Sequence, residues 1–160
     1  MNIEFKRIHD FDRGILYDLL RDAYSYDSRN EECWGTDWQD FDGFFFDNPE
    51  IADKCGFITT LDDKAIGFVS WDPRNIPEYV QIGHNCLDTK YKGNGYGRLQ
   101  MQEAINRIKQ TNVNKIIVTT NGHFIPAQRM YESVGFLECG RRVNVESEFA
   151  GEYIDYEMVL

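Results

Sequence analysis

Apolar positions along this chain follow two different periods, and each period predicts a different element. Ile3 and Phe5 alternate with polar neighbours, which predicts an opening strand over 2–8. The next apolar positions have helical spacing and predict an amphipathic helix; they are Leu16, Leu19, Leu20 and Ala23. A polar stretch from Tyr26 to Asp37 follows, and the aromatic residues of 38–45 predict a second helix.

Short strands and helices are expected over the rest of the chain. Residues 55–61 and 65–71 predict a hairpin closed over Asp62 and Asp63, and a further strand is expected at about 78–87. Later helices are expected at 97–109 and 126–134, and later strands at 115–120, 136–143 and 152–159. The pattern shows no repeat or linker, so we expect one mixed α/β domain over 1–160.

The charge balance disfavours some classes of partner. The formal net charge is −10, from 17 basic and 27 acidic residues, so nucleic acid is not an expected partner. An acidic surface can attract a cationic acceptor such as an amine, and it can equally serve solubility. No apolar run approaches the ~20 residues of a membrane span, so no membrane partner is expected.

Cysteine and histidine spacing gives no sign of a disulfide framework or a metal site. The chain holds 4 cysteines, at 33, 55, 86 and 139, without a C-x-x-C motif. Reduced thiols and an N-terminus without a secretion pattern favour a cytoplasmic protein. His84, His123 and Cys86 do not stand at ligand spacing, so no metal is expected.

The segment from Lys90 to Arg98 carries the most specific chemistry in the sequence. Three glycines at 93, 95 and 97 lie where a strand ends and a helix begins, among basic residues in an acidic chain. Free N–H groups at a helix start, next to glycines that permit positive φ, form a cradle for an anion such as pyrophosphate. The string is not a P-loop, and Arg98 stands where a Rossmann fingerprint needs its third glycine.

Two blocks of this chain resemble motifs of the GNAT-superfamily N-acetyltransferases. Lys92 stands at the first position of the Q/R-x-x-G-x-G/A signature, which Gly95 and Gly97 complete. The segment from Ala127 to Phe136 resembles the later A-x-x-x-Y-E-x-x-G-F segment of that family, with Tyr131 as its tyrosine. The family often has Asn seven residues before this tyrosine, where this chain has Phe124.

The resemblance implies a fold and a donor. The expected fold is a mostly antiparallel sheet with about four helices, splayed between its fourth and fifth strands, at 78–87 and 115–120. The implied donor is acetyl-CoA, whose pantetheine arm would pair with backbone groups of the fourth strand. The residues that the resemblance assigns to the donor are Asn85, Cys86, Leu87, Lys92, Gly93, Asn94, Gly95, Tyr96, Gly97, Arg98 and Ala127.

The implied reaction is direct attack of an amine on the thioester in a ternary complex. The Leu87 N–H would stabilise the oxyanion, and Tyr131 would protonate the leaving thiolate, although Tyr131 can also be read as a core aromatic. The family's base position falls near Gln81, which is no base, and His84 lies on the opposite face unless a bulge re-aims it. Glu78 with a water relay through Gln81 is a further alternative for the base.

The resemblance implies that the acceptor is an amine of a small molecule or a protein. The polar stretch with Trp34 is expected to form one wall of its site, together with Gln81. Two other functions stay open: a non-catalytic acyl-CoA-binding or sensing module on the same fold, and an unrelated ATP-binding protein. Cys86 could also serve as an acyl-accepting nucleophile. The C-terminal edge strands allow a homodimer.

Overall fold

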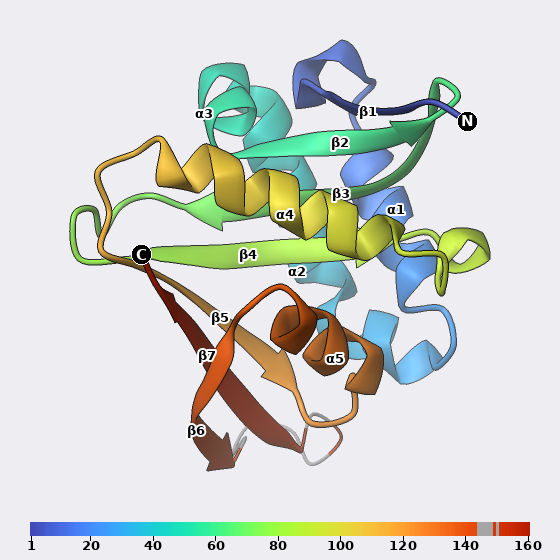
Figure 1. The fold of residues 1–160 in the computed structure, drawn as a ribbon. Coiled ribbons are helices and arrows are strands. Elements are labelled where there is room, and N and C mark those ends of the chain that lie inside the picture. Colours follow the sequence, from blue (N-terminus) through green and yellow to red (C-terminus); the bar gives the residue numbers. More distant parts are fainter. Residues whose placement is uncertain (144–148, 150) are drawn as a thin grey trace. The chain divides into compact units, whose positions relative to one another are not determined.

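The structure is a computed structural model that describes residues 1–143, 149 and 151–160. Five α-helices and seven strands occur among these residues (Figure 1). The helices are α1 (Ile15–Ala23), α2 (Ser28–Asp47), α3 (Pro49–Lys54), α4 (Tyr96–Lys109) and α5 (Ile125–Ser133). The strands are β1 (Ile3–Lys6), β2 (Gly56–Leu61), β3 (Lys64–Asp72), β4 (Val80–Leu87), β5 (Lys115–Asn121), β6 (Leu137–Val143) and β7 (Glu152–Val159). Single 3-10 turns lie at Ile8–Asp10 and Thr89–Tyr91.

The chain divides into two compact units, and both β4 and α4 contribute residues to each. The first unit comprises Met1–Ser70 and His84–Gln100. Its strands follow the order β1-β2-β3-β4. The β1–β2 and β2–β3 pairs are antiparallel, and the expected hairpin closes over Asp62 and Asp63, whose φ angles are 48° and 68°. Fully buried apolar side chains fill this unit; they include Leu16, Leu20, Phe57, Ile58, Ile66 and Phe68.

The second unit comprises Trp71–Gly83 and Met101–Leu160. Its strand order is β4-β5-β7-β6. The first half of β4 pairs with β5 in parallel, through Val80 with Ile116 and Gln81 with Ile117. The β5–β7 and β6–β7 pairs are antiparallel. The sheet is therefore mixed and mostly antiparallel, as the sequence predicts.

The polar stretch before Trp38 differs from its sequence-based prediction, because it is the first half of the 20-residue helix α2. The Asp27 side chain caps this helix by accepting a hydrogen bond from the Arg29 backbone N–H at 3.0 Å. The buried positions of the helix include Asn30 and Gly35, so the buried face has no apolar period there. The short helix α3 was also not predicted, although Pro49 suits its first turn.

Asp42 joins helices α1 and α2. Its carboxylate is 4% exposed and accepts hydrogen bonds from the backbone N–H groups of Gly14, Leu16 and Tyr17, at 2.9, 3.0 and 3.2 Å. These N–H groups lie at the start of α1, where no intrahelical acceptor exists and where a negative charge is favourable. The buried carboxylate of α2 therefore serves as the N-terminal cap of α1.

Candidate functional site

The glycine segment forms an open cradle of backbone N–H groups in the first unit. Gly93 and Gly95 have φ angles of +82° and +84°, and α4 begins directly after them at Tyr96. Within the described part of the chain, the N–H groups of residues 93–98 donate to no protein acceptor. Six consecutive free N–H groups at a helix start create a positive, accessible surface that suits a phosphate group.

The three glycines serve this cradle for two different reasons. At Gly93 and Gly95 the positive φ would strain any other residue. At Gly97 the φ is not positive, and a Cβ atom would meet nothing within 4 Å. The protein itself therefore has room for a side chain at Gly97. A bulky residue there would instead occupy the space above the N–H groups, where a ligand would lie.

The three basic side chains of the segment do not share one role. The Lys92 Nζ donates to the Ala23 carbonyl oxygen at 2.7 Å and lies 5.7 Å from the centre of the Tyr26 ring. Desolvation lowers the pKa of this ammonium. Among the described residues, Lys90 and Arg98 form no side-chain hydrogen bond or ion pair. The sequence assigns Lys92 to the donor phosphates, but in the structure its ammonium binds the end of α1, while Arg98 stays beside the cradle.

Two further hydrogen bonds connect residues 88–92, which precede the cradle, to the end of α1. The Asp22 carboxylate accepts from the Thr89 backbone N–H at 2.9 Å, and the Thr89 hydroxyl donates to the Asp22 carbonyl oxygen at 3.0 Å. Together with Lys92, these contacts fix the segment 88–92 against the last turn of α1.

The backbone of β4 alternates between two edges. The Asp88 N–H donates to the Ile66 carbonyl oxygen at 2.6 Å, and the His84 N–H donates to the Ser70 Oγ at 3.0 Å. Residue numbers rise along β4 as they fall along β3, so the two strands are antiparallel. Even-numbered residues of β4 thus turn their backbone groups toward β3, and Asn85 and Leu87 turn theirs toward the opposite edge.

Cys86 differs from its neighbours Asn85 and Leu87 in the direction of its backbone groups. Its carbonyl oxygen faces β3, because it would lie 2.4 Å from a Cβ atom on Gly67 and because it accepts from the Gln100 amide at 3.1 Å. Burial also raises the pKa of its thiol to about 12. A thiol with this pKa stays protonated at neutral pH, which argues against Cys86 as an acyl-accepting nucleophile.

His84 lies among aromatic side chains of the first unit. Its ring lies edge-on to Phe41 of α2, with 4.4 Å between the ring centres, and Phe68 lies 6.4 Å away. Burial lowers the pKa of His84 to about 4, and the nearby Asp37 carboxylate offsets only part of this effect. The imidazole is therefore neutral at physiological pH and is a weak base. Its backbone N–H bonds to a side chain instead of the β3 backbone, which marks an irregular β3–β4 ladder here.

The predicted acceptor residues lie on different elements. Trp34 is half-buried on α2, one turn before Trp38, which stacks on Tyr24 with ring centres 5.6 Å apart. Gln81 is half-buried on β4 and pairs with Ile117 in the second unit. On α2, Phe41 contacts the His84 ring and the Asp37 carboxylate raises its pKa, so α2 reaches His84 through these two residues and not through Trp34.

Tyr131 lies in the aromatic core of the second unit. Its side chain is 5% exposed, and its ring centre is 5.7 Å from that of Phe136 and 6.0 Å from that of Tyr156. The Tyr156 hydroxyl donates to the Glu132 carboxylate at 3.1 Å, and burial raises the pKa of Tyr156 to about 12. Tyr131 therefore has the burial expected of a core aromatic, and this burial is equally compatible with an acid that donates while uncharged.

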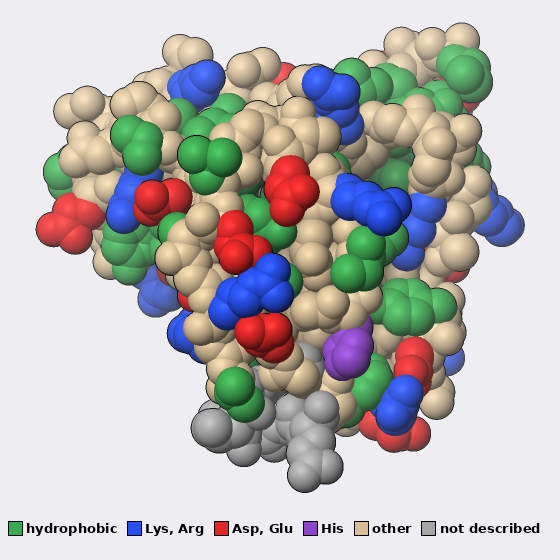
Figure 2. Space-filling view, turned by 60° about the horizontal axis from the view of Figure 1, so that its bottom comes forward, with side chains coloured by type: hydrophobic (Ala, Val, Ile, Leu, Met, Phe, Trp, Pro, Cys, Tyr) green, Lys and Arg blue, Asp and Glu red, His purple; other side chains and the backbone are tan. Residues whose placement is uncertain are grey.

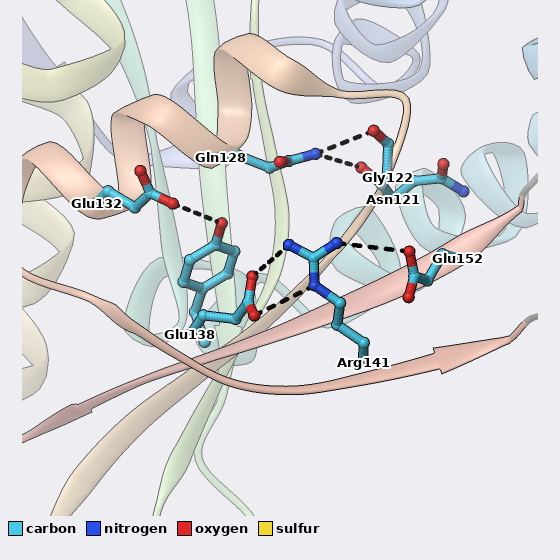
Figure 3. Close-up of polar contacts among 8 residues, drawn as sticks. Asn121, Gly122, Gln128, Glu132, Glu138, Arg141 and Glu152 are labelled. Atoms are coloured by element: carbon cyan, nitrogen blue, oxygen red, sulfur yellow. Dashed lines mark hydrogen bonds and ion pairs between the residues drawn. The ribbon is translucent and has the colours of Figure 1, made fainter.

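Polar side-chain contacts connect α5 to β5 and connect β6 to β7 (Figure 3). Gln128 donates to the carbonyl oxygens of Asn121 and Gly122 at 3.2 and 3.1 Å, which fixes α5 to the end of β5. Arg141 of β6 lies between Glu138 and Glu152. Ala127, predicted to contact the donor, is half-buried in the first turn of α5.

The face drawn in Figure 2 and the described His, Cys, Asp and Glu side chains give no sign of a charged patch or a metal site. On the face drawn in Figure 2, acidic and basic side chains are interspersed, without a patch of one sign. Among the residues that the structure describes, no three His, Cys, Asp or Glu side chains form a group that could hold a metal ion. No helix of the described chain is long and apolar enough to cross a membrane.

Gln100 was not predicted from the sequence. It is 0% exposed and forms four hydrogen bonds, to β2, β3 and β4. The signal was available, since Gln100 is an amide on the otherwise apolar buried face of the helix 97–109.

Comparison with known proteins identifies related sequences and folds. The family model described as Acetyltransferase (GNAT) family matches residues 15–136. N-acetylaspartate synthetase from Xenopus tropicalis is 23% identical over 105 residues, which cover 66% of this chain and 38% of that protein. The chain thus spans well under half the length of this relative.

Solved structures show the same fold at low sequence identity. The PaiA N-acetyltransferase from Thermoplasma acidophilum, in complex with coenzyme A, has a TM-score of 0.76 and 14% identity over 99% of this chain and 100% of that chain. The ribosomal-protein-S18-alanine N-acetyltransferase from Escherichia coli has a TM-score of 0.72 and 18% identity over 99% and 92%.

Proposed function

This chain belongs to the acetyltransferase (GNAT) family, and we propose that it transfers an acetyl group from acetyl-CoA to a primary amine. The observation that carries the proposal is the cradle of six free N–H groups over residues 93–98, at the start of α4. A pyrophosphate is the part of acetyl-CoA that such a cradle suits. The relative from Thermoplasma acidophilum was solved with coenzyme A, which supports this choice of donor.

Backbone groups of β4 would hold the rest of the donor. Asn85 and Leu87 turn theirs away from β3, so they are available to an extended, amide-rich arm that adds like a strand. Arg98 adds a positive charge beside the cradle. Of the residues predicted for the donor, this assignment uses the backbone groups of Asn85 and Leu87 and the side chain of Arg98, and it leaves out Cys86 and Lys92, which have other contacts.

The reaction is a direct transfer. The amine nitrogen attacks the thioester carbonyl carbon, a C–N bond forms, and the C–S bond breaks to give an acetamide and the CoA thiolate. The Leu87 N–H donates to the carbonyl oxygen as it becomes an oxyanion. The protonated thiol of Cys86 favours this route over an acyl-enzyme, because no ionised nucleophile lies on this part of β4.

The reaction also requires two proton transfers, one to the leaving thiolate and one from the attacking amine. The Tyr131 hydroxyl gives one to the CoA thiolate and regains it from solvent; this role follows from its position in the family motif. The amine loses the other to water. His84 stays neutral above about pH 5 because its pKa is about 4, so its role would be to accept a hydrogen bond from the incoming amine.

The relatives suggest which amines to test first. The similarity to N-acetylaspartate synthetase suggests aspartate as a test amine. The similarity to the ribosomal-protein-S18-alanine N-acetyltransferase suggests a peptide with an N-terminal alanine. A polyamine represents the cationic acceptors that the net charge of −10 would attract.

Calorimetric titration with acetyl-CoA tests the donor assignment, with ATP and magnesium as the comparison. We expect micromolar binding of acetyl-CoA, weakened at least about tenfold in Gly97→Leu, which fills the space above the cradle. The variant Gly43→Ala, in helix α2, is the control for a glycine substitution away from the cradle. Binding of ATP alone would exclude the proposal.

Replacement of Tyr131 by Phe separates an enzyme from a binding module on the same fold. The phenyl ring keeps the contacts with Phe136 and Tyr156 and removes only the hydroxyl. For an enzyme, we expect turnover of the accepted amine to fall by about 10²-fold while acetyl-CoA affinity is retained. A wild-type protein that binds acetyl-CoA and acetylates none of a broad amine panel would support the binding module.

A further inference from the structure

Gln100 is a buried amide on a helix face that is otherwise apolar. It lies in the second turn of α4, is 0% exposed, and shares the buried face with Met101, Ala104 and Ile108. An amide without partners in this position would be strongly unfavourable, so its hydrogen bonds explain why the position accepts a polar residue.

The amide of Gln100 joins three strands. Its Nε2 donates to the carbonyl oxygens of Phe68 and Cys86, at 2.9 and 3.1 Å, and to the Asn85 Oδ1 at 2.8 Å. Its Oε1 accepts from the Thr59 hydroxyl at 2.7 Å. Nε2 has two hydrogens for three acceptors, so one hydrogen is shared. The two carbonyl oxygens and the Asn85 Oδ1 only accept, so they fix the NH2 end of the amide on their side, and the Thr59 hydroxyl donates to the other end.

Gly67 leaves the space that this arrangement needs. A Cβ atom on Gly67 would lie 2.4 Å from the Cys86 carbonyl oxygen and 2.9 Å from the Gln100 Oε1. A side chain on Gly67 would therefore push the Cys86 carbonyl away from the Gln100 amide. The contact between Gln100 and Cys86 depends on a glycine in the neighbouring strand.

The Cys86 carbonyl and the Leu87 N–H belong to one peptide unit. This unit is planar and trans, so its C=O and N–H bonds point in opposite directions. A donor that holds the Cys86 oxygen on the β3 side therefore aims the Leu87 N–H toward the other edge of β4. The same hydrogen bond polarises the peptide and makes its N–H a better donor.

We propose that Gln100 is a positioning residue for acetyl transfer, which orients and polarises the peptide whose Leu87 N–H receives the oxyanion. This inference rests on the proposed function. Gln100 does not touch the donor; it acts through the Cys86–Leu87 peptide. Because Gln100 also lies one turn beyond the start of α4, it holds this peptide at a fixed spacing from the phosphate cradle.

The stretching frequency of the donor carbonyl tests the inference, with isotope-labelled acetyl-CoA bound to the protein and followed by infrared difference spectroscopy. The wild-type protein should move the thioester carbonyl to lower wavenumber, and Gln100→Met should lose this shift. With an accepted amine, kcat should fall by about 10²-fold in Gln100→Met while acetyl-CoA affinity changes by less than about threefold. Ile108→Ala, a core truncation on the same helix, should lose stability and keep the shift.

The outcomes separate this inference from the proposed function. Failure of the wild-type protein to bind acetyl-CoA overturns both. Binding with no carbonyl shift overturns the role of Leu87 and, with it, that of Gln100. A wild-type shift that persists in folded Gln100→Met overturns the role of Gln100 alone.

A measurement on the wild-type protein covers the case in which Gln100→Met does not fold. In nuclear magnetic resonance spectra, exchange of CoA for acetyl-CoA should shift the Leu87 amide proton and the Gln100 side-chain amide protons together, because they share one polarised peptide. A Leu87 response without a Gln100 response would overturn the inference.

Discussion

Acidification from pH 7 toward pH 4 should destabilise this protein through His84. Burial against Phe41 and Phe68 lowers its pKa from 6.5 to about 4 in the folded state. Above about pH 6.5 the imidazole is neutral in both the folded and the unfolded chain, so it contributes no pH dependence. As the pH falls below 6.5, the unfolded chain binds a proton that the folded state does not bind. The free energy of unfolding therefore decreases from about pH 6.5 down to about pH 4.

The size of the effect follows from the difference between the two pKa values. Linkage gives a loss of about 2 kcal/mol between about pH 7 and pH 5, and of about 3 kcal/mol by pH 4. These figures are upper bounds, because the His84 side chain keeps some solvent contact. The folded-state pKa of about 4 already includes the Asp37 carboxylate, which raises it. Removal of that carboxylate in Asp37→Asn should make the loss larger.

Urea unfolding followed by tryptophan fluorescence would measure this loss in the wild-type protein and in His84→Phe. The phenyl ring preserves an aromatic contact with Phe41 and cannot titrate. The carboxylates titrate in both proteins, so the difference between the two free energies of unfolding isolates His84. We expect this difference to change by about 2 kcal/mol from pH 7 to pH 5 in favour of His84→Phe. A difference that stays constant over this range would refute the reasoning.

Other substitutions test the cradle and the helix cap. Gly95→Ala should cost about 1 kcal/mol of stability because of its φ of +84°, whereas Gly97→Ala, at a helical position of α4 with room for a Cβ atom, should raise the free energy of unfolding by about 0.5 kcal/mol; urea titration of both variants would show this contrast. Lys92→Met should lower the melting temperature of the ligand-free protein, whereas Arg98→Met should weaken CoA binding and reduce its salt dependence, as calorimetry at several salt concentrations can establish. If Lys92→Met weakened CoA binding and Arg98→Met did not, Lys92 would be the residue that binds the phosphates. Asp42→Ala should remove about 2–4 kcal/mol of stability, because three backbone N–H groups lose a charged acceptor; a loss under about 0.5 kcal/mol in urea unfolding would contradict the cap.

Local requirements explain which parts of the fold were predictable. The cradle was found because positive φ at Gly93 and Gly95 and a helix start are properties of a short segment. The hairpin over Asp62 and Asp63 was found for the same reason. The first half of α2 was missed because the buried face there contains Asn30, whose place in the core depends on a hydrogen bond to the Tyr24 carbonyl oxygen and not on an apolar period.

Side-chain roles in the site were harder to predict, because distant partners decide them. The positive charge of Lys92 suggested phosphate, but its ammonium binds Ala23, far away in the sequence. Cys86 lies between two residues with suitable backbone groups, but the direction of its own carbonyl depends on the pairing with β3. His84 was one of two alternatives for the base, and its weak basicity depends on aromatic surroundings, Phe41 and Phe68, that the sequence does not show.

The contacts between α1 and residues 88–92 determine which sequence changes this part of the protein can accept. The Lys92 ammonium and the Thr89 hydroxyl both donate to main-chain carbonyl oxygens, which any residue at 22 or 23 supplies. Substitutions on the solvent side of α1 therefore leave these two anchors intact. An insertion or deletion that shifts the last turn of α1 removes both at once. Natural or designed variation should thus be tolerated in the composition of the solvent-facing side of α1 and restricted in the length of the helix.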